Sequence, residues 1–283
     1  MRFIWFGLGR FGLPMAKNLI DRGHDILVPT NGAHGAAAAR EALAWGARPT
    51  EPATAVDGWL TCLPRPEDVR EVLASIDRSQ TSLVVDFSTG HPTGARDIAS
   101  WLHDRDIRYV DSPVSGSPAQ AAEGSLTTWA GAPEPERGSV IRGLLEDVAA
   151  NIFYMGTVGT GSAMKLVNQV VHITNIAALG DGLALARALG VDEQLAVASM
   201  QTSSADSAML RRFGPAIVAH DFSPRFALKL ASKDVRFATA EAAQHDVQLD
   251  LLRLVADRLM KLEAEGYGES DFSVLASSLA QEA

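Results

Sequence analysis

The sequence predicts an α/β chain of two domains: an N-terminal doubly wound sheet over residues 1–160 and an all-α domain over residues 161–283. Three observations predict this division. Short apolar runs alternate with helical patterns up to about residue 155, which is typical of a parallel sheet. A proline-free stretch from Gly161 to Gly190 then predicts one long helix, which at ~1.5 Å per residue can pass between two domains. After Gly190 only helical patterns follow.

The first apolar run, Arg2–Phe6, leads directly into a glycine-rich turn, a helical pattern and a second strand, His24–Val28. In this context G-x-G-x-x-G is the fingerprint of a dinucleotide-binding Rossmann domain. Gly7 permits the tight turn, Gly9 lets the backbone approach a pyrophosphate, and Gly12 lets the helix pack on the strand. The helix N-terminus supplies free N–H groups to the anion. The expected cofactor contacts in this turn are Gly7, Leu8, Gly9, Arg10, Phe11 and Gly12.

The residues after the second strand bear on cofactor preference. An acid there would bind a free ribose 2′-hydroxyl, and an arginine would bind a 2′-phosphate. The sequence has neither, and instead places Thr30 and Asn31 at this point. Because no acid repels a 2′-phosphate and both side chains can hydrogen-bond it, the pair favours NADP and leaves NAD open.

Further α/β units follow along the first domain. The expected strands are Gly58–Leu63, Leu83–Phe87, Ile107–Val110, Leu126–Ala130 and Ile152–Met155. Glu41–Gly46 is expected to be the end of a helix, and further helices are expected over Pro66–Ile76, Asp97–His103 and Ile141–Ala149. Leu63, Pro64 and Thr89 lie just past strand ends. This carboxyl edge is where a doubly wound sheet binds ligands.

A second loop of small residues, Asp111–Pro118, follows the strand Ile107–Val110. Ser115, Gly116 and Ser117 offer hydroxyl and N–H donors that suit a carboxylate. The same composition also suits a plain surface turn, so the loop alone leaves both interpretations open.

Four polar residues share one face of the long helix, because Lys165, Asn168, Gln169 and His172 are spaced at i, i+3, i+4 and i+7. A lysine in the first turn of a mostly apolar helix is near the positive end of the helix dipole. Dipole and burial both disfavour the ammonium form, so we expect a lowered pKa and a role in proton transfer. The alternative is that Lys165 extends into water and the amides only pack or cap.

The composition excludes several function classes. With 47% hydrophobic and 21% charged residues the chain is an ordinary globular one, and its net charge of −9 argues against a nucleic-acid partner. A single cysteine, Cys62, excludes an internal disulfide and a cysteine-rich zinc site, and the histidines show no metal-binding spacing. The sequence shows neither a signal-peptide layout nor an 18-residue apolar run, so no membrane association is expected. A cytoplasmic location is expected instead. Broad apolar helix faces in the second domain predict a homodimer or homotetramer.

Four blocks in the same order resemble the β-hydroxyacid dehydrogenase family, which includes 3-hydroxyisobutyrate dehydrogenase and tartronate semialdehyde reductase. The blocks are Gly7–Leu19, Asp111–Gly116, Gly159–Gln169 and Lys233–Asp234. The second and third blocks are specific to this family, whereas many dinucleotide binders share the first.

The resemblance implies hydride transfer between NAD(P) and a small 3-hydroxy acid or its semialdehyde. Lys165 matches the family's catalytic lysine, which acts as general acid and base. Asn168 and Gln169 match amides that hold the lysine or the substrate, and Ser115 and Gly116 match the loop that binds the substrate carboxylate.

The resemblance also implies cofactor contacts at Leu63, Pro64 and Thr89, and from Lys233 in the second domain. Two departures concern the substrate. Ser117 stands where the family usually has a second glycine, so it narrows the carboxylate pocket or adds a donor, and Trp129 is bulkier than expected.

Three other functions compete with this one. An imine reductase shares the architecture but usually carries a different proton donor at the position of Lys165. A cofactor-binding module without turnover tends to lose this lysine. A decarboxylating sugar-acid dehydrogenase is usually longer than 283 residues.

Overall fold

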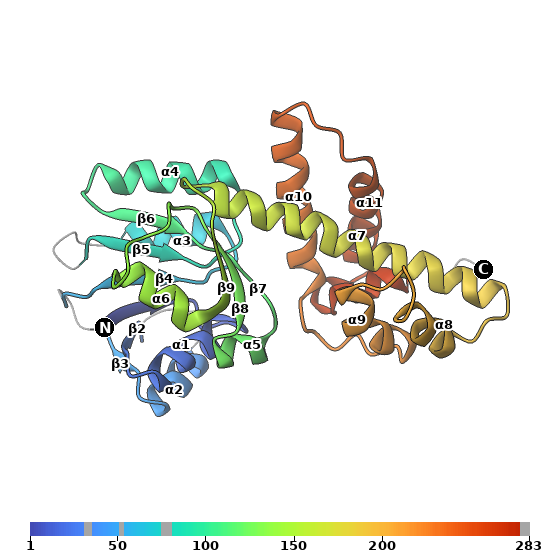
Figure 1. Cartoon of the computed structure of the whole chain (residues 1–283), viewed down its shortest axis with the longest axis horizontal. Helices are drawn as coiled ribbons and strands as arrows, with labels where there is room; N and C mark the ends of the chain where they lie inside the picture. Colours follow the sequence, from blue (N-terminus) through green and yellow to red (C-terminus); the bar gives the residue numbers. More distant parts are fainter. Residues whose placement is uncertain (31–35, 51–53, 75–80, 278–283) are drawn as a thin grey trace. The chain divides into compact units, whose positions relative to one another are not determined.

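The computed structural model describes residues 1–30, 36–50, 54–74 and 81–277. The chain divides into two compact units, Met1–Lys165 and Leu166–Ala283. The division falls inside the long helix α7 (Thr160–Ala188), and each unit has its own hydrophobic core. Figure 1 labels most of the helices and strands of both units.

The first unit is built on a six-stranded sheet in the order β3-β2-β1-β4-β5-β6, in which every pair is parallel. The order reverses between β1 and β4, and in such sheets ligands bind at the carboxyl ends of the strands beside this point. The doubly wound sheet predicted from the sequence is therefore confirmed. The strands are β1 (Arg2–Phe6), β2 (Asp25–Val28), β3 (Arg48–Pro49), β4 (Gly58–Thr61), β5 (Leu83–Asp86) and β6 (Arg108–Asp111).

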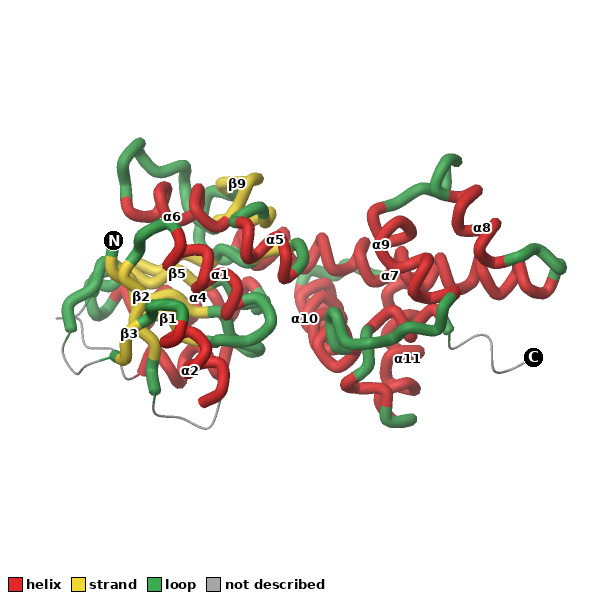
Figure 2. The backbone as a smooth tube through the Cα atoms, turned by 90° about the horizontal axis from the view of Figure 1, so that it is seen from below, coloured by secondary structure: helices red, strands yellow, loops and turns green. Residues whose placement is uncertain are grey.

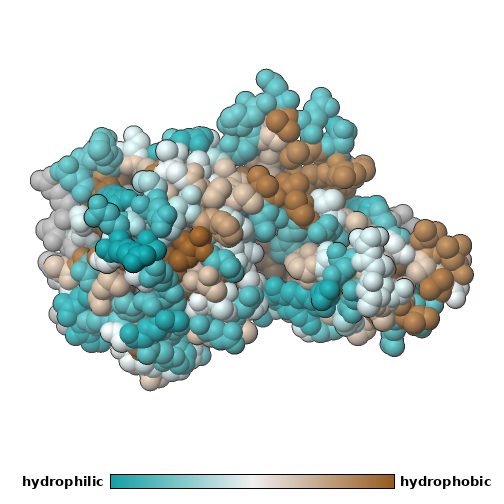
Figure 3. Space-filling model, in the orientation of Figure 1, coloured by the Kyte–Doolittle hydropathy of each residue, from teal (hydrophilic) through white to brown (hydrophobic). Residues whose placement is uncertain are grey.

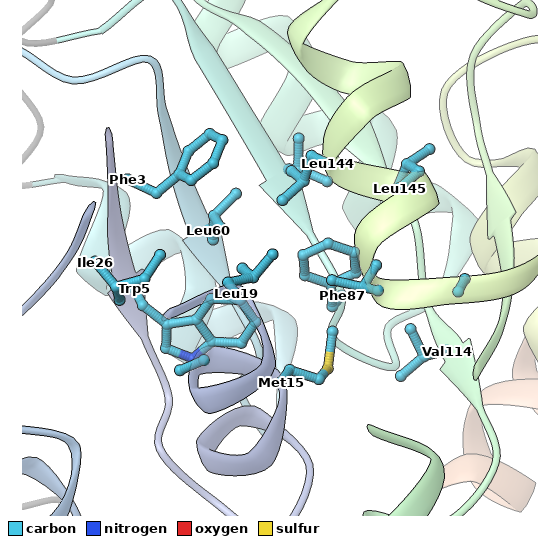
Figure 4. Packing of buried hydrophobic residues seen from close by; sticks show 14 of the residues in the cluster. Phe3, Trp5, Met15, Leu19, Ile26, Leu60, Phe87, Val114, Leu144 and Leu145 are labelled. Atoms are coloured by element: carbon cyan, nitrogen blue, oxygen red, sulfur yellow. The ribbon is translucent and has the colours of Figure 1, made fainter. Parts of the chain in front are cut away.

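Helices cover both faces of this sheet. Alternate residues of a strand point to opposite faces, so Trp5 of β1 packs in one cluster and Ile4 in another. The first cluster takes side chains from α1 and α6, as Figure 4 shows for Met15, Leu19 and the residues around them. The second takes side chains from α3 and α4. The helices are α1 (Gly12–Asp21), α2 (Ala36–Ala44), α3 (Pro66–Ala74), α4 (Pro92–His103), α5 (Pro118–Glu123) and α6 (Val140–Val148).

A separate three-stranded sheet completes the first unit. It consists of β7 (Val114–Ser115), β8 (Leu126–Ala130) and β9 (Ala149–Tyr154), with β7 antiparallel and β9 parallel to β8. The sequence predicted β8 and β9, but the interpretation of residues 111–118 as a single loop was wrong. Because this segment consists of small and turn-forming residues, its local pattern predicted neither β7 nor the start of α5. The conformation of β7 depends on its pairing with β8.

The second unit is helical over its described residues, apart from an isolated bridge between Ala227 and Asp271. The tube view shows this unit as helices and loops (Figure 2), and the prediction of an all-α second domain is confirmed. Besides the larger part of α7 it contains α8 (Glu193–Met200), α9 (Ala208–Val218), α10 (Leu228–Gln244), α11 (Asp250–Ala264) and the 3₁₀ turns η1 (Tyr267–Glu269) and η2 (Phe272–Ala276). No helix in the described residues combines the length and apolar character that crossing a bilayer requires.

Candidate active site

The glycine turn joins β1 to α1 and is tightly packed at two of its three glycines. Gly7 has a φ of +95°, and a Cβ there would lie 2.2 Å from the carbonyl oxygen of Cys62. A Cβ at Gly12 would lie 1.8 Å from the carbonyl oxygen of Gly7. At Gly9, by contrast, no heavy atom lies within 4 Å of the Cβ position. The fold thus requires Gly7 and Gly12, whereas the space beside Gly9 is open to a ligand.

The N-terminus of α1 lacks a side-chain cap. Phe11 occupies its N-cap position and makes no side-chain hydrogen bond there, whereas His91, Ser117 and Ser139 cap α4, α5 and α6. The first N–H groups of a helix have no intrahelical acceptor, and together with the helix dipole they favour an anion. The open space at Gly9 and the uncapped helix therefore fit the pyrophosphate of a dinucleotide.

Strands β4, β5 and β6 are tied together by the buried carboxylate of Asp86, at the carboxyl end of β5. It accepts hydrogen bonds from the hydroxyls of Thr61 (2.8 Å) and Tyr109 (2.7 Å) and from the backbone N–H of Ser88 (2.9 Å). The Ser88 hydroxyl in turn accepts from the backbone N–H of Leu63 at 2.8 Å. These bonds hold the two loops that follow β4 and β5, where the cofactor contacts Leu63, Pro64 and Thr89 are expected.

Two ionisable groups at this edge stay neutral near pH 7. Burial and the neighbouring Asp86 carboxylate raise the pKa of the Cys62 thiol to about 12. The same two causes raise the pKa of the Tyr109 phenol well above its usual value. Because the thiolate is the reactive form, Cys62 is not a nucleophile here.

Thr30 is exposed two residues beyond the end of β2. Asn31 lies outside the described residues.

Within the described part of the chain, no group of three or more potential metal ligands occurs.

The serine loop is partly regular structure. Ser115 belongs to β7 and pairs with Thr127 of β8. Gly116 has a φ of +152°, which strains residues other than glycine, and a Cβ there would lie 2.6 Å from the Leu126 side chain, so this position favours glycine. Ser117 is the N-cap of α5, where its hydroxyl accepts a hydrogen bond from the N–H of Gln120 at 3.2 Å. Ser117 thus has a structural role that the sequence analysis missed, and its expected contact with substrate stays a prediction.

Lys165 is buried in the first unit, with 7% of its surface exposed. Its Nζ donates a hydrogen bond to the carbonyl oxygen of Val114 at 2.9 Å. The alternative in which Lys165 extends into water is therefore wrong. The helix begins at Thr160, however, so Lys165 lies in the second turn of α7 and not in the first, where the dipole acts most strongly. The structure brings Lys165 next to the segment that carries Ser115.

Asp111 joins the start of α7 to the end of β6. Its buried carboxylate accepts hydrogen bonds from the backbone N–H groups of Gly159 at 2.8 Å and Ser162 at 2.7 Å. Burial raises the pKa of Asp111, and the two amides partly oppose that rise. The sequence analysis singled out neither Asp111 nor the Val114 carbonyl as part of a site.

A second polar group belongs to the other unit. Gln169 donates its amide N–H to Asp234 at 2.7 Å, and Lys233 forms an ion pair with the same carboxylate at 3.1 Å. The amide oxygen of Gln169 accepts from Asn168 at 3.1 Å and lies 3.3 Å from Nδ1 of His172. Because this oxygen can only accept, Nδ1 carries the proton in that contact. Asp234 thus orients two predicted site residues, Gln169 and Lys233, although no role was predicted for it from the sequence.

Two family models together match nearly the whole chain. Residues 2–156 match the family model described as the NAD-binding domain of 6-phosphogluconate dehydrogenase. Residues 159–279 match the model described as the NAD-binding region of NADP-dependent 3-hydroxyisobutyrate dehydrogenase.

Two curated relatives align with this chain over nearly their full lengths. The chain is 30% identical to the NAD-dependent L-serine dehydrogenase of Pseudomonas aeruginosa, with 96% of this chain and 95% of the relative covered. It is also 30% identical to the 2-hydroxy-3-oxopropionate reductase of Escherichia coli, with 99% and 97% covered. The structure of the Mycobacterium tuberculosis 3-hydroxyisobutyrate dehydrogenase with L-serine superimposes with a TM-score of 0.85 at 26% identity, covering 98% of both chains. An imine reductase from Pseudomonas sp. gives a TM-score of 0.62 at 18% identity, a likeness of fold alone.

Proposed function

The chain belongs to the β-hydroxyacid dehydrogenase family, and from that premise we propose how its residues carry out the reaction. It is an NAD(P)-dependent oxidoreductase that transfers a hydride between the cofactor and a small 3-hydroxy acid or its semialdehyde.

We assign Lys165 as the general acid and base of the reaction. The observation that carries it is that a buried lysine is hydrogen-bonded to Val114, next to the serine loop. When bound, the nicotinamide cofactor supplies or accepts the hydride at the carbon that bears the oxygen. In reduction, the Lys165 ammonium gives a proton to the aldehyde oxygen as that oxygen gains negative charge. In oxidation, the neutral amine takes the hydroxyl proton, so that charge and protons balance in both directions.

The substrate carboxylate is assigned to Ser115 and Gly116, which adjoin the Val114 carbonyl that holds Lys165. Asn168 and Gln169 follow Lys165 on α7 and are assigned to the substrate as well. Two relatives are named for L-serine and for 2-hydroxy-3-oxopropionate, both of which are three-carbon acids. We therefore propose a three-carbon acid whose C3 is oxidised from alcohol to aldehyde.

The cofactor is assigned to the glycine turn, to Leu63, Pro64 and Thr89, and to Lys233. Open space at Gly9 and the uncapped start of α1 support a pyrophosphate there. Thr30, with Asn31 after it, favours NADP over NAD, since no acid stands at the end of β2.

Lys165→Met tests the proton donor, because methionine keeps the length and apolar stem of lysine. The assay is oxidation of NADPH or NADH by 2-hydroxy-3-oxopropionate, and its reverse with L-serine. We expect turnover to fall by about 10²–10⁴-fold while NADPH binding, followed by fluorescence titration, is retained. Unchanged turnover in Lys165→Met would refute the assignment, and equal affinities for NADH and NADPH would refute the preference for NADP.

A homodimer is supported by an exposed apolar stripe on α7. The stripe consists of Val167, Val171, Ala178 and Leu185 on α7 and of Leu189 just after its end. These residues recur at helical spacing and are all exposed, with 71% exposure at Leu189. The space-filling view shows apolar surface at the end of the unit where α7 leads to α8 (Figure 3). The small residue Ala178 near the middle of the stripe allows a second helix to approach, and we assign the stripe to α7 of a second copy.

Light scattering coupled to size-exclusion chromatography tests this assembly. We expect the double variant Leu185→Asp, Leu189→Asp to elute as a monomer, since charges would be buried in the interface. Phe153→Asp replaces an exposed apolar residue of the first unit and should leave the dimer intact. A monomeric wild-type chain would refute the assignment. We also propose a reducing compartment such as the cytoplasm, in keeping with the single cysteine.

A further inference from the structure

The start of α7 is held by a carboxylate from another element. Asp111, at the end of β6, is 1% exposed. Its Oδ1 accepts from the N–H of Gly159 and its Oδ2 from the N–H of Ser162. These belong to the N–H groups at a helix start that no intrahelical carbonyl can satisfy, and a negative charge is favourable there. Asp111 therefore determines where α7 begins relative to β6.

Two glycines let the helix start sit directly on the strand ends. A Cβ at Gly161 would lie 2.2 Å from the carbonyl oxygen of Trp129, and a Cβ at Gly131 would lie 1.9 Å from Oδ1 of Asp111. Gly131 also donates its N–H to the carbonyl oxygen of Asp111 at 2.7 Å. No side chain separates the main chains at this junction, so small shifts of α7 are opposed by direct backbone contact.

Lys165 forms a second connection between the same two segments. It follows Ser162 by nearly one helical turn, and its Nζ donates to the carbonyl oxygen of Val114, which follows Asp111 in the chain. The segment after β6 and the start of α7 are thus joined at two points, by the hydrogen bonds of Asp111 and by the hydrogen bond of Lys165. If the bonds at Asp111 are lost, α7 can rotate about its axis or slide along it. Successive residues of a helix are about 100° apart around the axis, so a shift by one residue would point the Lys165 side chain in a different direction.

We propose that Asp111 is a positioning residue for Lys165. By holding the first turn of α7 against β6, it places the Lys165 ammonium at the Val114 carbonyl and beside Ser115. Asp111 itself neither touches the substrate nor transfers a proton. This inference rests on the proposed function, because it assigns the position of a group whose catalytic role is itself proposed.

Asp111→Asn is the decisive variant, since it keeps the shape of the side chain but replaces one acceptor oxygen with an NH₂ group that cannot accept. We expect kcat per folded molecule to fall by about 10–100-fold, the size of effect that a misplaced catalytic group produces. The KM for NADPH should stay within about twofold, because the cofactor contacts are unchanged. Asp111→Ala should lose more activity than Asp111→Asn, as no acceptor remains.

Asp271→Asn is a matched control. Asp271 is a fully buried aspartate of the second unit that accepts backbone N–H groups from Arg225, Phe226 and Ser273. Its substitution should lower the melting temperature but leave kcat unchanged. If Asp111→Asn and Asp271→Asn lower kcat equally, or if neither does, Asp111 is only a stabilising residue and the proposal is refuted.

A measurement without substrate separates this inference from the proposed function. Competitive acetylation followed by mass spectrometry reports the accessibility of Lys165, and hydrogen exchange reports the amides of residues 159–163. Both should be slow in the wild type and faster in Asp111→Asn. If they respond while the wild type turns over no substrate, the positioning role stands and the proposed function fails. If kcat falls in Asp111→Asn with no change in either rate, the effect does not pass through α7 and the proposal is wrong.

Discussion

Asp111 and Asp234 are both buried carboxylates, and each is bonded to a segment that carries a predicted site lysine. They differ in what they hold. Asp111 accepts backbone N–H groups at the start of α7, whereas Asp234 accepts the side-chain amide of Gln169 and pairs with Lys233. A bond to the main chain places a whole helix, but a bond to a side chain selects a rotamer that can readjust. The first unit thus positions its lysine through the backbone, and the second orients its polar residues through side chains.

The largest expected effect concerns the backbone junction on the Asp111 side. Gly161→Ala would bring a Cβ to 2.2 Å from the Trp129 carbonyl oxygen, which cannot rotate away. We expect a loss of about 3 kcal/mol in the free energy of unfolding, measured with urea. Gly143→Ala, in the interior of α6, is the control: its nearest neighbour would be the Met1 side chain at 3.6 Å, and it should gain about 0.5–1 kcal/mol. A Gly161→Ala protein as stable as the wild type would show that main-chain contact does not seat α7.

A smaller effect is expected on the Asp234 side. Asp234→Asn removes the charge opposite Lys233 and frees the Lys233 and Gln169 side chains to change rotamer. We expect the Kd for NADPH to rise about fivefold, or ~1 kcal/mol, with kcat nearly unchanged, as isothermal titration and steady-state kinetics would show. Lys229→Gln removes a surface lysine of α10, the helix that also carries Asp234. Lys229 pairs with Glu269 of η1, and this variant should change neither value. If Asp234→Asn lowers kcat and spares the Kd, the contrast with Asp111 is reversed.

The smallest effect is the pH dependence that the Asp111 carboxyl contributes to stability. Burial raises its native pKa above the ordinary value of 3.8. Between 3.8 and the native pKa the folded protein binds more protons than the unfolded chain, so this group's contribution to the unfolding free energy falls as pH rises. The stability of wild type relative to Asp111→Asn should therefore be greater near pH 4 than at about pH 7 in urea unfolding. A difference that grows with pH would contradict the assigned direction.

Local patterns were sufficient for most of the fold. Strands β1, β4 and β5 are continuous apolar runs because both faces of the sheet are covered, and the run length identifies them. The two-residue strand β3, Arg48–Pro49, has no such pattern and exists through its pairing with β2. The start of α5 did carry a local signal, because Ser117 followed by Pro118 is a helix N-cap and first position. That signal was obscured by the glycine and proline that also suit a turn.

The site divides in the same way. The glycine turn and Lys165 could be found from spacing and from the family resemblance. Asp111 could not be paired with Gly159 and Ser162, which lie 48 and 51 residues away in the sequence. Gln169 and Asp234 are separated by 65 residues. Such bonds depend on how distant segments pack, which no local periodicity records.

The partner of Lys165 is a main-chain carbonyl, and every amino acid at position 114 would supply the same atom. A mutational scan would score Val114 by how well each replacement fills the core, where it is 8% exposed, and would leave its bond to the lysine undetected. Weakening that acceptor requires chemical synthesis, for example an ester in place of the peptide linkage between residues 114 and 115, which makes the carbonyl a poorer hydrogen-bond acceptor without altering any side chain. Residue 114 can therefore change in evolution without loss of the hydrogen bond between its carbonyl oxygen and Lys165.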